Sequence, residues 1–93
     1  MEEIIYYSAL YDYYGVLLTK VQQGYFEDYY FNNLSLQEIA DNHNITKNAV
    51  SKSLKEVKEK LDYYEANLNL YKNKNKIKKI ISDDTFTIIE KYI

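Results

Sequence analysis

The fold is decided by the stretch from Ser35 to Leu61, SLQEIADNHNITKNAVSKSLKEVKEKL. Its first four residues, Ser35 to Glu38, form a capping box. In such a box, the serine hydroxyl and the glutamate side chain each accept a hydrogen bond from a backbone N–H at the start of a helix. Leu34 and Ile39 flank this box at the spacing of a hydrophobic staple. The pattern predicts a short helix over residues 36 to about 43.

A second cap and a tight turn follow this helix. Thr46 stands where a helix N-cap is expected, with Ile45 and Val50 at staple spacing. Asn44, just before them, is able to adopt the left-handed backbone conformation, which asparagine tolerates better than most residues. Ala40 supplies the small residue that two steeply crossing helices need at their contact. This arrangement is typical of a helix-turn-helix, here at about residues 35–57.

The helix that begins after Thr46 carries an apolar seam at heptad spacing, and its sequence gives no reason to end early. The seam consists of Val50, Leu54, Val57, Leu61, Tyr64, Leu68 and Tyr71. Helical spacing also predicts helices from about Glu2 to Tyr14, from Thr19 to about Phe31, and from Thr85 to Ile93. We therefore expect an all-α fold in a single domain over residues 1–93. It consists of a helix-turn-helix with a long recognition helix and flanking N- and C-terminal helices.

The composition excludes several classes of protein. The 93 residues contain no cysteine and no proline, which argues against disulfides, thiolate catalysis and zinc–thiolate sites and favours long helices. No apolar run approaches the length of a membrane span and the first residues, MEEII, are acidic. We therefore expect a cytoplasmic protein with no membrane span and no signal peptide.

The charge is distributed unevenly along the chain. Residues 1–45 carry seven acids and one lysine, whereas residues 46–93 carry eleven lysines and seven acids. Because salt confines each charged patch to its surroundings, a protein of net charge −2 is still able to present a basic face. The overall charge is therefore weak evidence against a nucleic-acid partner.

In a helix-turn-helix, the N-terminal part of the second helix enters the major groove of DNA. The outward positions of that part are Lys47, Asn48, Ser51, Lys52 and Lys55. The asparagine is suited to adenine, the serine to either base edge, and the lysines to phosphates. The chain contains no arginine, the commonest reader of guanine, so we expect binding led by phosphate contacts and DNA shape. The alternative is a solvated lysine face on an ordinary helix.

No other group of residues predicts a catalytic, cofactor or metal site. His43 is the only histidine, and no second metal ligand stands near it, so a partly buried structural role is expected. The most basic stretch, KNKNKIKK from Lys72 to Lys79, has five lysines and no acid. It fits a solvated turn and a patch for an anionic partner equally well. We therefore expect that the protein is not an enzyme and that it binds neither a cofactor nor a metal ion.

The outer half of the seam extends beyond a compact three-helix unit and needs cover, either from the first helix, from the C-terminal segment or from a partner chain. Tyr64, Leu68 and Tyr71, together with part of the first helix, predict the interface of a homodimer. The first helix has apolar side chains on two sides. One side fits the core, and the other fits either a second subunit or an edge that tyrosines tolerate in water.

The chain from LLTKVQQ to EANLNLY resembles the YlxM family, small bacterial helix-turn-helix proteins associated with the signal recognition particle. The likeness runs from about Tyr7 to about Ile81. It is carried by LLT, the Tyr29–Tyr30 pair, SLQEIA and the DYYE segment at residues 62–65. The middle is more distantly similar to region 4 of bacterial sigma factors, which reads promoters. Lys47, Asn48 and Ser51 replace the family's usual Arg-Gln and aromatic residue, so no base preference carries over.

The resemblance implies an all-helical fold and a role beside the signal recognition particle, because the family is typically encoded next to the particle's GTPase. Two functions are then open. The first is a DNA-binding regulatory protein that uses the five outward positions of the recognition helix. The alternative is a protein-interaction module of the secretion machinery that does not bind DNA. It would bind components of the signal recognition particle through the first helix and the outer half of the long helix.

Overall fold

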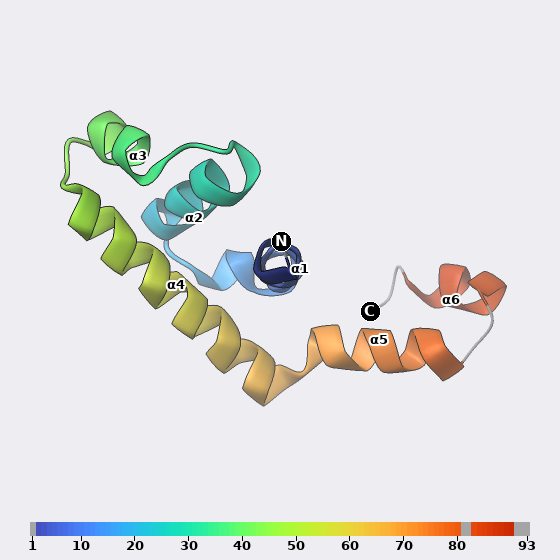
Figure 1. Ribbon diagram of the computed structural model, residues 1–93. Coiled ribbons are helices and arrows are strands. Elements are labelled where there is room, and N and C mark those ends of the chain that lie inside the picture. Colours follow the sequence, from blue (N-terminus) through green and yellow to red (C-terminus); the bar gives the residue numbers. More distant parts are fainter. Residues whose placement is uncertain (1, 81–82, 91–93) are drawn as a thin grey trace.

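The computed structural model describes residues 2–80 and 83–90, and these form helices joined by short turns, without a strand (Figure 1). In chain order the elements are α1 (Glu2–Tyr14), η1 (Gly15–Leu17), α2 (Lys20–Phe26), η2 (Glu27–Phe31), α3 (Leu36–His43), α4 (Lys47–Leu68), α5 (Leu70–Ile80) and α6 (Asp83–Glu90). The element η1 is a short 3-10 helix, and η2 is a π-helix that continues α2. The predicted all-α helix-turn-helix architecture is confirmed, with α3 and α4 as its two helices.

Three N-caps set the starts of α2, α3 and α4, and the caps predicted at Ser35 and Thr46 are among them. The hydroxyls of Thr19, Ser35 and Thr46 each accept a hydrogen bond of 3.1 Å from the backbone N–H of the third helical residue. At Thr19 and Ser35 the reciprocal bond of the capping box is also made. Because each cap uses groups within one turn, its geometry follows from the local sequence alone.

Three asparagines with positive φ end helical segments. Asn33 (φ 56°) leads out of η2, and Asn44 (φ 55°) forms the predicted turn between α3 and α4. The third, Asn69 (φ 55°), lies after α4 at a place where no turn is predicted. Asparagine takes this conformation at a lower cost than other side chains, so all three turns are made without glycine.

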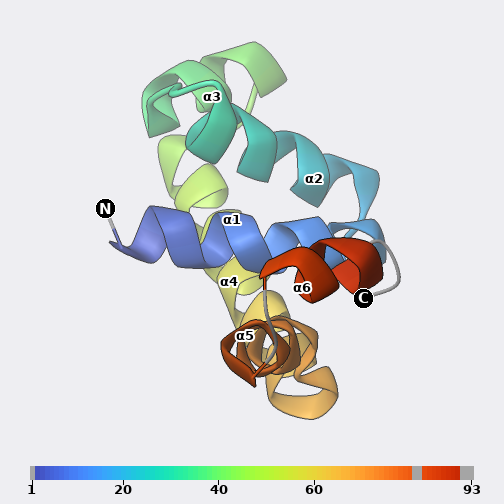
Figure 2. The same ribbon diagram turned by 90° about the vertical axis from the view of Figure 1, so that its right-hand side faces the viewer.

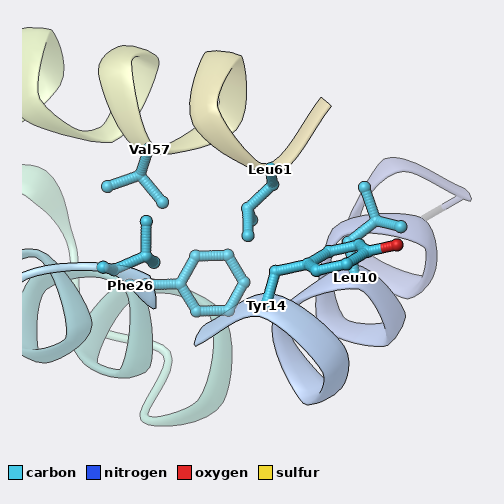
Figure 3. Packing of buried hydrophobic residues seen from close by; sticks show 6 residues of the cluster. Leu10, Tyr14, Phe26, Val57 and Leu61 are labelled. Atoms are coloured by element: carbon cyan, nitrogen blue, oxygen red, sulfur yellow. The ribbon is translucent and has the colours of Figure 1, made fainter. Parts of the chain in front are cut away.

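Two buried clusters line the inner side of α4 and hold the other helices against it. The smaller cluster joins α2 and α3 to the first half of α4 and consists of Tyr25, Ile39, Ala40, Val50 and Leu54. The larger joins α1 and α2 to the second half and consists of Leu10, Tyr14, Leu18, Phe26, Val57 and Leu61. Figure 3 shows two of these side chains from α4 facing those of α1 and α2. Figure 2 shows α1 lying between α2 and the pair α5 and α6.

The long helix ends earlier than the heptad seam predicts. The seam continues to Tyr71, but α4 ends at Leu68 and the chain turns at Asn69. Figure 1 shows α5 leaving α4 at a sharp angle there. The seam is therefore divided between two helices, and the prediction of one uninterrupted helix is wrong.

The break is stabilised by Tyr14, which is distant in sequence from α5, and by Glu65 near the end of α4. The Tyr14 hydroxyl accepts a hydrogen bond of 3.1 Å from the first N–H of α5, at Leu70. The Glu65 carboxylate accepts from the next two N–H groups, at 3.3 and 3.1 Å. A buried carboxylate therefore caps the start of α5, where a helix favours negative charge.

The basic stretch from Lys72 to Lys79 lies within the helix α5, so its reading as a turn is wrong. The final helix α6 begins at Asp83, two residues before the predicted start. The predicted end of that helix, at residues 91–93, lies outside the described residues.

Candidate nucleic-acid interface

The five predicted contact residues lie on the solvent-facing side of the first half of α4. This orientation is set by Val50 and Leu54, which are buried against Ile39 and Ala40 of α3. All five are exposed: Lys47, Asn48, Ser51, Lys52 and Lys55. The structure therefore brings them together on one accessible face of α4. Figure 1 shows that this half of α4 follows directly after the turn from α3.

The lysines of α4 fall into two groups. The Lys58 ammonium pairs with the Glu3 carboxylate of α1, and the Lys60 ammonium donates a hydrogen bond of 3.1 Å to Gln22 of α2. Within the described part of the chain, Lys47, Lys52 and Lys55 have no ion pair with an acid. Among the lysines of α4, the three that are exposed and have no ion pair with a described acid therefore belong to the predicted contact residues.

A pocket of about 200 Å³ opens beside this face, between η2 and α4. It is lined by Tyr29, Tyr30, Leu36, Ser51, Leu54, Lys55 and Lys58. In the sequence, Tyr29 and Tyr30 stand out only through the family resemblance, and helical spacing does not predict this pocket. Two side chains predicted to contact DNA, Ser51 and Lys55, form part of its wall.

His43 lies at the edge of the α2–α3 contact and is less buried than expected. Its ring meets that of Tyr25 edge-on at a centroid distance of 4.9 Å, and its Nε2 lies 3.6 Å from an Asp28 carboxylate oxygen. Its side chain is 38% exposed. Among the described residues, no group of three or more histidines, cysteines or acids is placed to hold a metal ion.

The three predicted interface residues have different surroundings. Tyr64 and Tyr71 are partly buried against the larger cluster of their own chain, and the Tyr71 ring meets Tyr6 of α1 edge-on at 5.9 Å. Leu68 is half exposed at the end of α4. Of the three, it alone has an exposed side chain that another molecule could cover.

None of the helices in the described residues combines the length and the apolar character needed to cross a membrane.

Comparisons with known proteins identify relatives of this chain. The family model UPF0122, described as "Putative helix-turn-helix protein, YlxM / p13 like", matches residues 1–91. A UPF0122 protein of Desulforamulus reducens is 46% identical over 70 residues, which cover 75% of this chain and 60% of that protein. One from Caldanaerobacter subterraneus subsp. tengcongensis is 38% identical over 80 residues, which cover 86% of this chain and 68% of that protein. One from Malacoplasma penetrans is 48% identical over 61 residues, which cover 66% of this chain and 57% of that protein. The chain thus spans roughly three fifths of the length of these relatives.

Proposed function

Because this chain belongs to the UPF0122 family of YlxM/p13-like helix-turn-helix proteins, we propose that it is a DNA-binding regulatory protein. The first half of α4 enters the major groove, and α3 crosses the backbone beside it. The observation that carries the proposal is the exposed face of α4, on which three lysines without an ion pair to a described acid surround Asn48 and Ser51.

These side chains suit a particular kind of binding. Asn48 is able to form two hydrogen bonds with adenine, and Ser51 is short enough for either base edge. Lys47, Lys52 and Lys55 act as point charges on phosphates. Without arginine, the interface lacks the planar donor that reads guanine. Affinity is then dominated by phosphate contacts and DNA shape, with a preference for A·T-rich sites.

The first test is the affinity for a mixed-sequence DNA duplex, measured by fluorescence anisotropy over a series of salt concentrations. Three lysines on phosphates predict that log affinity falls against log salt with a slope of roughly −3. Lys52→Glu combined with Lys55→Glu should weaken binding at least about tenfold at low salt, because two attractive contacts become repulsive.

A matched control is Lys76→Glu combined with Lys79→Glu on α5, which changes the charge equally at two other exposed lysines. This control should bind nearly as well as the original protein. Equal affinity of the α4 double variant and the original protein would contradict the proposal. Circular dichroism of both variants verifies that the helices are intact.

A second candidate is a protein-interaction module of the secretion machinery that contacts components of the signal recognition particle. It is favoured by the exposed apolar side chains Ile4 and Ile5 of α1 and Tyr63 and Leu68 of α4. The test is co-purification with the particle's GTPase after nuclease treatment. Retention of the GTPase would support this function, and its loss on nuclease treatment would count against it.

A further inference from the structure

The pocket between η2 and α4 has walls that are held in place by the core. The Tyr30 ring stacks on Phe26, which is fully buried, at a centroid distance of 4.4 Å. Tyr29 meets Tyr30 edge-on at 5.2 Å. Both tyrosines belong to the π-helix η2, a type of segment that is rare and is frequently found at functional sites. The opposite wall is formed by α4.

The polar side chains that line this pocket are hydrogen-bond donors. They are the hydroxyls of Tyr29, Tyr30 and Ser51 and the ammonium groups of Lys55 and Lys58, and no carboxylate is among the described residues that line it. Lys58 is partly neutralised by Glu3, but Lys55 has no ion pair with a described acid. A pocket with several donors, an unpaired cation and no acid favours an anion.

One of these donors lacks a partner. The Tyr30 hydroxyl is buried and donates no hydrogen bond to a described acceptor. The neighbouring Lys58 ammonium is itself a donor and cannot accept its proton. Burial raises the pKa of this hydroxyl, and the nearby Lys58 ammonium opposes that shift. The group therefore remains a protonated donor at neutral pH. A buried hydroxyl without an acceptor destabilises the protein. A ligand that accepts its hydrogen bond would remove this free-energy cost.

We propose that this pocket binds a phosphate group, specifically a backbone phosphodiester of the nucleic acid that α4 contacts. The Tyr30 hydroxyl donates to a phosphate oxygen, and Lys55 supplies the compensating charge. Ser51 and Lys55 then have a second role, because they join the base-contacting face to the phosphate site. This inference rests on the proposed function for its ligand, but the pocket itself is testable with phosphate alone.

The test variant is Tyr30→Phe, which removes only the unpartnered hydroxyl and leaves the ring stacked on Phe26. We expect the Kd for the duplex to rise about tenfold, since a hydrogen bond to a charged group is lost. The slope of log affinity against log salt should stay unchanged, because a neutral hydroxyl releases no counterion. Resistance to urea should be equal or higher, because a buried hydroxyl without a partner is removed.

The matched control is Tyr13→Phe. The Tyr13 hydroxyl is likewise buried without a described partner, but it lines a different pocket, between α1, α5 and α6. This variant should bind the duplex as the original protein does. If Tyr30→Phe lowered both affinity and stability, its hydroxyl would have a structural role and the proposal would be overturned. An unchanged affinity for Tyr30→Phe would also overturn it, while leaving the proposed function intact.

A second measurement separates the two proposals. Backbone amide shifts in NMR are followed while inorganic phosphate is added, against sodium chloride at matched ionic strength. Saturable shifts at Tyr30, Ser51 and Lys55, absent in Tyr30→Phe, would support the phosphate site. If the protein failed to bind the duplex at low salt, the proposed function would fail. Saturable shifts would then assign the pocket to a free phosphate-bearing ligand, and their absence would overturn the site as well.

Discussion

At the scale of single residues, the contact between Tyr14 and Glu65 has the largest structural consequence. The Tyr14 hydroxyl donates a hydrogen bond of 2.6 Å to the Glu65 carboxylate and accepts one from the backbone of α5. Tyr14 is 1% exposed and Glu65 is 9% exposed. Because both are buried, removing either one would leave the other with one hydrogen-bond partner fewer and no water to replace it. The pair therefore connects α1, α4 and α5 at one point.

This contact predicts a loss of stability at alkaline pH. Burial, and next the hydrogen bond to Glu65, raise the pKa of Tyr14 to about 12. An unfolded tyrosine has a pKa of about 10. The folded state therefore holds the proton more tightly, so this contribution to stability is complete below about pH 10 and is lost as the pH rises towards about 12. Urea unfolding at increasing pH, with tyrosinate absorbance as a second signal, measures the loss.

The variant for this prediction is Tyr14→Phe. It should be less stable at neutral pH by about 1–3 kcal/mol, because it leaves a buried carboxylate with one partner fewer. Its further loss of stability above about pH 10 should be smaller than in the original protein. Some loss should persist, because the pKa of Tyr7 is also raised to about 12, by burial and by its hydrogen bond to Asp62. A decline as steep as in the original protein would contradict the role of Tyr14.

At the scale of elements, the sequence predicted those helix boundaries that depend on neighbouring residues. The caps at Ser35 and Thr46 and the turn at Asn44 each lie within a few residues of the groups they satisfy. The break after Leu68 could not be predicted in this way. Its hydrogen bonds come from Tyr14 and Glu65, and the first of these lies 56 positions away from its partner in α5. The heptad seam continues without interruption through the break, so periodicity predicts the wrong element.

The candidate site, too, was predicted only in the part that follows from the local sequence. Helical periodicity was sufficient to predict the outward face of α4, because the buried residues Val50 and Leu54 fix the rotation of the helix. The pocket beside it was not predicted. Its tyrosines stand in a π-helix, whose wider turn changes which side chains share a face, and α-helical spacing places them differently.

The turn at Asn69 gives a prediction at this scale. Its backbone, at φ 55° and ψ 28°, disfavours residues with a Cβ other than asparagine and aspartate. Asn69→Ala should lower the free energy of unfolding by about 1 kcal/mol, whereas Asn69→Gly should leave it unchanged or slightly higher. Both are measured by urea unfolding. Asn67→Ala, two residues earlier and inside the helix, is the control and should be nearly neutral. Equal effects of alanine at 67 and 69 would contradict a stabilising turn.

At the scale of the whole molecule, the chain is more extended than a compact domain of its length. Its radius of gyration is 15.6 Å and its longest extent is 49 Å, against a radius of about 12 Å for a typical domain of this length. Its accessible surface of 6594 Å² exceeds by roughly 900 Å² what a compact monomer of 11.1 kDa exposes. That excess is close to the area that one partner contributes to a standard interface, about 800 Å².

The extended shape supports the homodimer that the seam predicts. Tyr64 and Tyr71 already pack against the larger cluster of their own chain. The interface should therefore centre on Leu68, which is 50% exposed, with Tyr63 (66% exposed) and Leu70 (44% exposed) beside it. A twofold arrangement would bury these side chains against their copies. Light scattering at about 100 μM, well above the range of weak micromolar association, should then give twice the mass of 11.1 kDa.

Leu68→Glu distinguishes this interface from other modes of association. The side chain is half exposed in the single chain, so the charge should be accommodated without unfolding, but it would face its copy across a twofold axis. The variant should therefore be monomeric with unchanged helix content. Val16→Glu, at an apolar position that is 83% exposed on η1, is the control and should remain dimeric. A monomeric mass for the original protein at about 100 μM would exclude the dimer. A dimer that persists in Leu68→Glu would place the interface elsewhere, because two buried carboxylates facing each other repel strongly.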